Sequence, residues 1–253
     1  MSQFDTRPAE SPGRPFALDR RLSVGVPAYY YPGPMWERTL AAGPLVRYIV
    51  VNPGDGPGVG IDASYTAAVR HARAAGITLL GYVPTGWGRR ALGDVVRDVR
   101  THAEFYGITN IFLDEVSTSA AFLRHYARIA DEIRGAARES LLALNPGVTP
   151  DEDYLGVADV LMQYEGPWNA YSGWSPPEWQ HRYDPERFWH VVYATPARMM
   201  RSALRRAVDR GVGIAYVTDA RANPWESLPS YWHEELAAIS ALDPRRAPGA
   251  STT

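Results

Sequence analysis

Eight short apolar runs recur along the chain, and they restrict how it can fold more than any other feature. Each run has the length of a β-strand, and several lack the strict alternation of apolar and polar residues that marks a half-exposed strand. Such runs are typical of strands buried on both faces of a parallel sheet. They lie at residues 23–29, 46–52, 77–83, 108–115, 139–145, 158–165, 188–194 and 212–219.

The segments between the runs carry helical signals. Asp62 is a candidate N-cap for a helix that ends at Gly76, and Thr195 followed by Pro196 is a typical helix start. The connections after the fifth and sixth runs are weaker, and residues 166–187 are predicted to be an aromatic-rich loop with one short helix. Two apolar stripes have helical spacing, namely Leu92, Val95, Val99, Ala103 and Tyr106, and Phe122, Tyr126, Ile129 and Ile133.

Strands that alternate with helices predict a parallel sheet. An open doubly wound sheet usually has fewer strands and a glycine-rich phosphate loop after the first, whereas the first run here ends in YYYPG at 29–33. We therefore predict one (β/α)8 barrel of the TIM type over residues 22–243, an architecture that 253 residues can supply. Residues 1–21 and 244–253 are rich in Pro, Arg, Ser or Gly and are predicted to be disordered tails.

Composition narrows the partners and the location. The formal net charge of −2 offers no basic excess for phosphates, so we expect no nucleic-acid partner. No stretch approaches the roughly 18 apolar residues of a membrane span, so we expect no membrane partner. Residues 1–21 lack the apolar core of a signal peptide. The chain as given is therefore expected in the cytoplasm, or outside the cell if a leader has been removed.

The sequence lacks the residues that several kinds of catalytic and metal site require. There is no cysteine, and all 26 basic residues are arginine, which excludes thiolate metal sites and Schiff-base lysine chemistry. The histidines do not have metal-ligand spacing, and the glycine-rich segment 52–60 lacks the G-x-G-x-x-G pattern. No G-x-S-x-G elbow is present. We therefore expect no metal, no other cofactor and no serine nucleophile.

In a barrel of this type, functional groups gather at the carboxyl ends of the strands. In this chain those ends and the loops just beyond them carry polar and aromatic side chains, whereas the opposite ends carry no comparable group of side chains. Aromatic rings stack on the apolar faces of sugars, and amides, phenols and carboxylates bond their hydroxyls, so we expect an oligo- or polysaccharide substrate. The candidate substrate-binding residues are Tyr29, Asn52, Tyr82, Trp87, Asn145, Trp168, Tyr193 and Asp219.

Asp114 and Glu115 end one strongly apolar run, and Glu165 ends another. Carboxylates at such positions are costly unless they face the solvated mouth of the barrel. Asp114 shares strand parity with Phe112, and we predict that it points toward the barrel axis. The alternative is that these residues are solvated strand ends or ion-pair partners for arginine.

Glycosidic cleavage needs two carboxyl groups of this kind. One carboxylic acid protonates the leaving oxygen, and a second carboxylate attacks the anomeric carbon or activates water. Asp114 and Glu165 are the preferred pair, with Glu115 as a third candidate that tunes a pKa or binds the sugar. The residues leave open which carboxyl group is the acid and whether the anomeric configuration is retained.

Several segments, in chain order, resemble the spherulation-specific family 4, or spherulin-4-like, proteins. They are VPAYYYPG at 26–33, VNPGDGPG at 51–58, LGYVPTGWGRR at 80–90, IFLDE at 111–115 and LNPG at 144–147. The resemblance implies membership of glycoside hydrolase family 135, whose characterised members are endo-acting α-1,4-N-acetylgalactosaminidases that cut galactosaminogalactan, a fungal exopolysaccharide. It also implies a catalytic site formed by Asp114, Glu115 and Glu165.

Two alternatives to this function remain. One is a barrel that binds polysaccharide without cleaving it, although such a protein needs aromatic platforms and has no need of paired acids. The other is a glycosidase for a different amino-sugar polymer, such as a de-N-acetylated one, whose cationic sugars an acidic subsite would favour.

Overall fold

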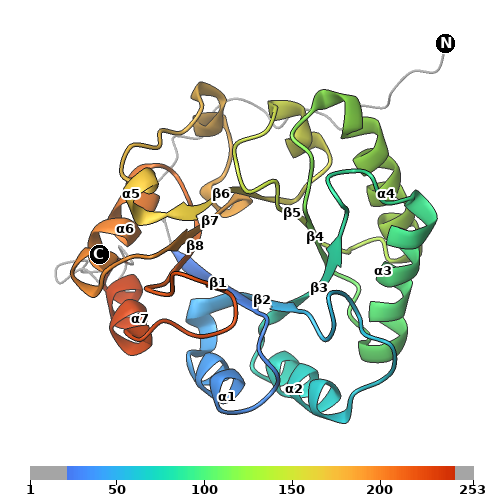
Figure 1. The fold of residues 1–253 in the computed structure, drawn as a ribbon, viewed down its shortest axis with the longest axis horizontal. Coiled ribbons are helices and arrows are strands. Elements are labelled where there is room, and N and C mark those ends of the chain that lie inside the picture. The colour runs from blue at the N-terminus through green and yellow to red at the C-terminus, as the bar shows by residue number, and fades with distance from the viewer. Residues whose placement is uncertain (1–21, 243–253) are drawn as a thin grey trace, which may run out of the picture.

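A computed structural model describes residues 22–242, and the predicted tails at 1–21 and 244–253 lie outside this range. Eight parallel strands close into a barrel in which each strand pairs with its neighbours in chain order (Figure 1). The prediction of a TIM barrel is therefore confirmed. The strands are β1 (Ser23–Ala28), β2 (Val46–Val51), β3 (Thr78–Pro84), β4 (Ile111–Asp114), β5 (Leu142–Leu144), β6 (Val160–Pro167), β7 (Phe188–Tyr193) and β8 (Ile214–Val217).

The α-helices surround the barrel as an outer ring (Figure 1). Asp62 caps its helix as predicted, since its carboxylate accepts the backbone N–H groups of Ser64 and Tyr65. No helix in the range 22–242 is long and apolar enough to cross a membrane. The helices are α1 (Pro34–Ala41), α2 (Ala63–Ala74), α3 (Leu92–Tyr106), α4 (Leu123–Ala136), α5 (Trp168–Tyr171), α6 (Ala197–Asp209) and α7 (Trp232–Ala241).

Two strands begin three residues later than predicted. β4 begins at Ile111 although its apolar run begins at residue 108, and β5 begins at Leu142 although its run begins at residue 139. The Asn110 side chain explains the late start of β4. Its amide oxygen accepts the N–H of Leu141 at 2.9 Å, and its amide nitrogen lies 3.4 Å from the carbonyl oxygen of Leu79. Side-chain hydrogen bonds thus replace ladder bonds at this point.

Large aromatic side chains fill the barrel interior below the mouth. The ring of Trp189 on β7 lies 5.9 Å from that of Tyr48 on β2 and 5.6 Å from that of Phe112 on β4. Gly25 on β1 makes room for the indole, because a Cβ atom at this position would lie 2.3 Å from Trp189 Cζ2. The packed rings form the floor on which the mouth of the barrel rests.

Gly25→Ala should lower the free energy of unfolding by about 1–3 kcal/mol, because it overpacks this floor. The matched control is Gly93→Ala in α3, where an added Cβ meets nothing within 4 Å and helix propensity should raise stability by roughly 0.5–1 kcal/mol. Urea denaturation measures both changes. A Gly25→Ala variant as stable as the parent would contradict the packing described.

Candidate active site

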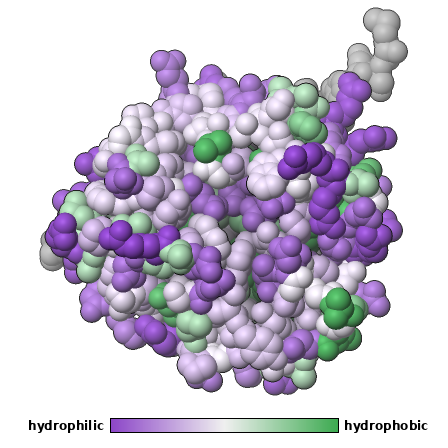
Figure 2. Space-filling view, viewed as in Figure 1, coloured by the Kyte–Doolittle hydropathy of each residue, from purple (hydrophilic) through white to green (hydrophobic). Residues whose placement is uncertain are grey.

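The loops that follow the strands surround one end of the barrel, and a hollow lies near the centre of this face, over the barrel axis (Figure 2). At this end of the barrel the side-chain amide of Asn145, which follows β5, lies between two carboxyl groups. Asn145 Nδ2 donates to Asp114 Oδ1 at 2.8 Å and to Glu165 Oε2 at 2.6 Å. Its amide oxygen accepts the N–H of Gly147 at 2.8 Å, which fixes which end of the amide faces the acids.

One amide nitrogen with two hydrogens can serve both carboxyl groups at once. The two accepting oxygens can therefore lie no farther apart than the sum of the two bond lengths, 2.8 and 2.6 Å. The structure thus brings together the preferred acidic pair of the sequence, with Asn145 as the bridge. Among residues 22–242, no arginine or histidine forms an ion pair with Asp114, Glu115 or Glu165.

Burial perturbs both members of the pair. Burial and, to a lesser degree, the neighbouring charge of Asp114 raise the pKa of Glu165 to about 7, while the hydrogen bond from Asn145 acts in the opposite direction. Burial also raises the pKa of Asp114, against hydrogen bonds from the Glu115 backbone, Tyr82 and Asn145 that lower it. Raised carboxyl pKa values in a hollow are typical of acid–base sites.

A β-bulge in β6 aims Glu165 at the barrel axis. Met162 pairs with Trp189 and Glu165 pairs with Val191, so β6 carries one more residue than β7 over this stretch. Residues that pair across two neighbouring strands point to the same side of the sheet. Trp189 points into the barrel, and Val191, two positions further along β7, therefore points into it as well. In a strand of the same residues that alternated regularly, Glu165 would face outward, since it lies three positions after Met162.

The extra residue of the bulge is Gln163. Its side-chain amide is fully buried and donates to Oε1 of Gln180 at 2.8 Å. Gln180 in turn donates to the carbonyl oxygen of Arg210 at 2.8 Å. The bulge is therefore held from the outside of the sheet by a buried amide pair.

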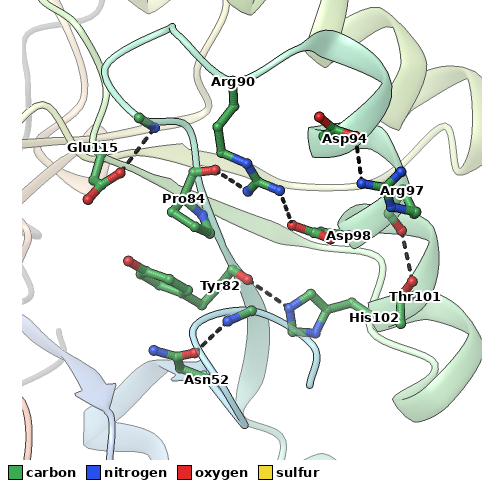
Figure 3. Close-up of polar contacts among 12 residues, drawn as sticks. Asn52, Tyr82, Pro84, Arg90, Asp94, Arg97, Asp98, Thr101, His102 and Glu115 are labelled. Atoms are coloured by element: carbon green, nitrogen blue, oxygen red, sulfur yellow. Dashed lines mark hydrogen bonds and ion pairs between the residues drawn. The ribbon is translucent and has the colours of Figure 1, made fainter. Parts of the chain in front are cut away.

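Glu115 lies beside Asp114 but faces a different loop. Its backbone is left-handed, with φ of 53°, a conformation that costs about 1–3 kcal/mol for a residue with a Cβ. Its Oε2 accepts the N–H of Gly86 at 3.0 Å (Figure 3). Its carbonyl oxygen accepts the N–H of Trp87 at 2.7 Å. The chain thus turns sharply after β4, and Glu115 is tied to the loop after β3.

Tyr82 on β3 connects this loop to the acids. Its hydroxyl bonds Asp114, and burial and the charge of Asp114 raise the Tyr82 pKa, so it remains a donor. Its carbonyl oxygen accepts from Nε2 of His102 on α3 at 2.8 Å, and burial lowers the pKa of His102 to about 4 (Figure 3). Arg90 bonds the neighbouring carbonyl of Pro84 at 2.6 Å. The end of β3 is thereby fixed from behind.

Aromatic rings line the side of the mouth above β1, β7 and β8. Tyr29 packs edge-on to Tyr82 with ring centroids 5.1 Å apart. Trp225, in the loop after β8, lies 6.5 Å from Tyr29 and 6.3 Å from Tyr193. Trp225 was not among the residues predicted from the sequence. Its place in a loop that follows a barrel strand is the signal that could have identified it.

Two predicted contact residues bond their own loops. Asn52 Oδ1 accepts the N–H of Gly56 at 2.8 Å. Asp219 accepts the N–H of Ser230 at 3.0 Å and its hydroxyl at 2.5 Å. The structure therefore gives each of these side chains a role in shaping the rim, and any role in binding substrate stays a prediction.

The two predicted tryptophan platforms differ in their surroundings. Trp87 is 52% exposed, and the guanidinium of Arg89 lies 5.4 Å from the centre of its ring. Trp168 is partly buried, with Tyr171 at 6.4 Å and the Arg206 guanidinium at 5.9 Å. Trp87 is thus free to meet a ligand on one face, whereas Trp168 packs toward α6.

Fold and site together define a glycoside-hydrolase-like TIM barrel. The chain belongs to spherulation-specific family 4, whose family model matches residues 23–239. It is 34% identical over 236 residues to Spherulin-4 of Physarum polycephalum, an alignment that covers 88% of this chain and 71% of that protein.

Several solved structures share the fold. Sph3 of Aspergillus clavatus, in complex with GalNAc, superposes with a TM-score of 0.78 at 24% identity, over 87% of this chain and 98% of that one. The glycoside hydrolase domain of PelA from Pseudomonas aeruginosa gives a TM-score of 0.50 at 16% identity, over 77% and 93%. The Bacillus cereus spore cortex-lytic enzyme SleL gives 0.56 at 12% identity, over 87% and 75%.

Replacing Asn145 by alanine should raise the pKa of Glu165 above about 7, because the hydrogen bond from Asn145 stabilises the ionised carboxylate. A carboxyl ¹³C NMR titration measures this shift without substrate. Asn169→Ala, in the exposed part of α5, is the control and should leave the titration unchanged. An unchanged or lower Glu165 pKa in Asn145→Ala would show that the bridge does not form.

Proposed function

We propose that this protein is an endo-acting glycoside hydrolase that cleaves α-1,4-linked N-acetylgalactosamine or galactosamine exopolysaccharide by carboxylate acid–base chemistry. The observation that carries the proposal is the Asn145-bridged pair of partly buried carboxyl groups at the mouth. The choice of sugar rests on family membership and on the Sph3 structure, which holds GalNAc in the same fold.

Glu165 is assigned as the general acid and Asp114 as the nucleophile. With a pKa of about 7, Glu165 holds a proton in a large fraction of molecules at neutral pH. Its Oε2 already accepts from Asn145, so the proton sits on Oε1 and passes from there to the leaving glycosidic oxygen. Asp114, which receives hydrogen bonds from Tyr82 and Asn145, attacks the anomeric carbon as a carboxylate.

The second half of the reaction reuses the same groups. Glu165, now ionised, takes a proton from water, and the hydroxide so formed breaks the ester between Asp114 and the sugar. Retaining glycosidases place their two carboxyl groups about 5–5.5 Å apart, whereas inverting enzymes leave about 6.5–9.5 Å for a water. A single amide nitrogen that bonds both acids at 2.8 and 2.6 Å supports the retaining geometry.

A de-N-acetylated polymer is the second candidate substrate. It is favoured by the observation that none of the three mouth acids has an arginine or histidine ion-pair partner among residues 22–242. An ammonium group on the sugar would supply a cation that the site itself lacks. Comparing cleavage of acetylated and de-N-acetylated chains of equal length distinguishes the two substrates.

Asp114→Asn and Glu165→Gln should each lower kcat by about 100- to 10,000-fold, because the amides keep the shape of the side chains but remove the charge and the transferable proton. Release of reducing ends from α-1,4-linked amino-sugar oligomers measures the loss. Glu104→Gln, at an exposed position on α3, is the matched control and should keep the parent rate. Full activity in either site variant would refute the assignment.

Activity should fall as the pH rises through about 7, because the acid form of Glu165 is then lost. ¹H NMR of the first product should show the α-anomer before mutarotation. If the β-anomer forms first, the reaction inverts the anomeric carbon, and Asp114 then activates a water instead of attacking as the nucleophile. A rate that stays constant from pH 6 to pH 9 would remove Glu165 from the role of acid.

A further inference from the structure

The turn that presents Asp114 and Glu115 is bonded by a buried threonine of the neighbouring loop. Thr85 follows β3 and is fully buried. Its N–H donates to the carbonyl oxygen of Asp114 at 2.9 Å. Its hydroxyl lies 3.0 Å from the same oxygen and 2.6 Å from the carbonyl oxygen of Glu115. One residue thus spans the two consecutive carbonyls at the point where the chain leaves β4.

The proton positions in this cluster follow from the partners. Carbonyl oxygens only accept, so the single hydroxyl proton of Thr85 is directed at them, with Glu115 at the shorter distance. Tyr126 on α4 lies 3.2 Å from Thr85 Oγ1 and must therefore donate to it. The Tyr126 oxygen accepts the N–H of Ser117 at 2.8 Å. A directed chain of bonds therefore runs from Ser117 through Tyr126 and Thr85 to Glu115.

The same turn is held at its far end by Tyr154. Its hydroxyl lies 2.5 Å from the carbonyl oxygen of Ser117 and 3.0 Å from that of Ser119. Thr85, Tyr126 and Tyr154 are all fully buried. Three hydroxyls from three separate elements therefore bind the backbone of residues 114–119, where no regular secondary structure would satisfy its carbonyl groups.

We propose that Thr85 is a positioning residue for the acidic pair, acting through the backbone of the turn after β4. Its hydroxyl holds the left-handed conformation of Glu115, so that the Glu115 carboxylate stays on the Gly86 N–H while Asp114 stays on the barrel axis. Thr85 itself touches no reacting atom. The reaction rate affected is that of the proposed hydrolase, so this inference rests in part on the proposed function.

Thr85→Val removes the hydroxyl and keeps the shape. It should lower kcat by about 100-fold with little change in KM, since a displacement of about 1 Å at reacting groups has an effect of this size. Thr85→Ser, which restores the hydroxyl, should recover the parent kcat. Thr39→Val is the matched control, because Thr39 is also buried between a backbone carbonyl, that of Met35, and a tyrosine hydroxyl, that of Tyr30. It should keep the parent kcat.

A second measurement needs no substrate. In the parent protein the Gly86 N–H should exchange slowly with solvent, because it donates to the Glu115 carboxylate. Thr85→Val should speed this exchange, and Thr85→Ser should keep the parent rate. If the parent cleaves no sugar, the proposed function fails, and the Gly86 exchange rate still decides the role of Thr85.

Two results would overturn the proposal. One is a folded Thr85→Val variant with the parent kcat or, in an inactive protein, the parent Gly86 exchange rate. The other is a Thr85→Ser variant as impaired as Thr85→Val, which would assign the effect to packing. If thermal melting shows that Thr85→Val does not fold, Tyr126→Phe decides instead. It removes the donor to Thr85 and should lower kcat and speed the exchange of the Gly86 N–H. A Tyr126→Phe variant with the parent kcat and the parent exchange rate would overturn the proposal.

Discussion

The mouth of this barrel depends on one side-chain amide that serves two carboxyl groups. Without Asn145, Asp114 and Glu165 would be two buried acids that face each other with no cation to offset their charges. Each amide hydrogen stabilises the ionised form of one acid, whereas burial favours the neutral form. The balance leaves the two acids in different environments, so one carboxyl group can hold a proton that the other lacks.

This arrangement costs stability at neutral pH. The folded-state pKa of Glu165, about 7, lies above the ordinary glutamate value of 4.5. The folded protein therefore holds a proton that the unfolded chain releases, and the stability this contributes is complete below pH 4.5 and lost as the pH rises through 7. The packed floor of Trp189, Tyr48 and Phe112 is a source of stability that offsets the cost. Function and stability are thus carried by different layers of the same barrel.

The apolar runs predicted all eight strands, because strands buried on both faces must be continuously apolar. Strand ends then identified Asp114, Asn145 and Glu165 as neighbours at one face. Sequence parity could not place Glu165, since its direction depends on the bulge at Gln163 and hence on a register between two strands. The hydroxyl contacts of Thr85 were equally hidden, because they join residues about 30 to 40 positions apart.

The bulge has an evolutionary consequence. A β6 of the same length that paired regularly with β7 would exchange the directions of Tyr164 and Glu165, so that a tyrosine faced the axis and the acid faced the helices. A descendant that lost the Gln163–Gln180 pair, and with it the bulge, could therefore lose the acid from its mouth while the glutamate persisted in its gene. The amide pair behind the sheet is thus as much a condition for an acid at the mouth as the glutamate itself.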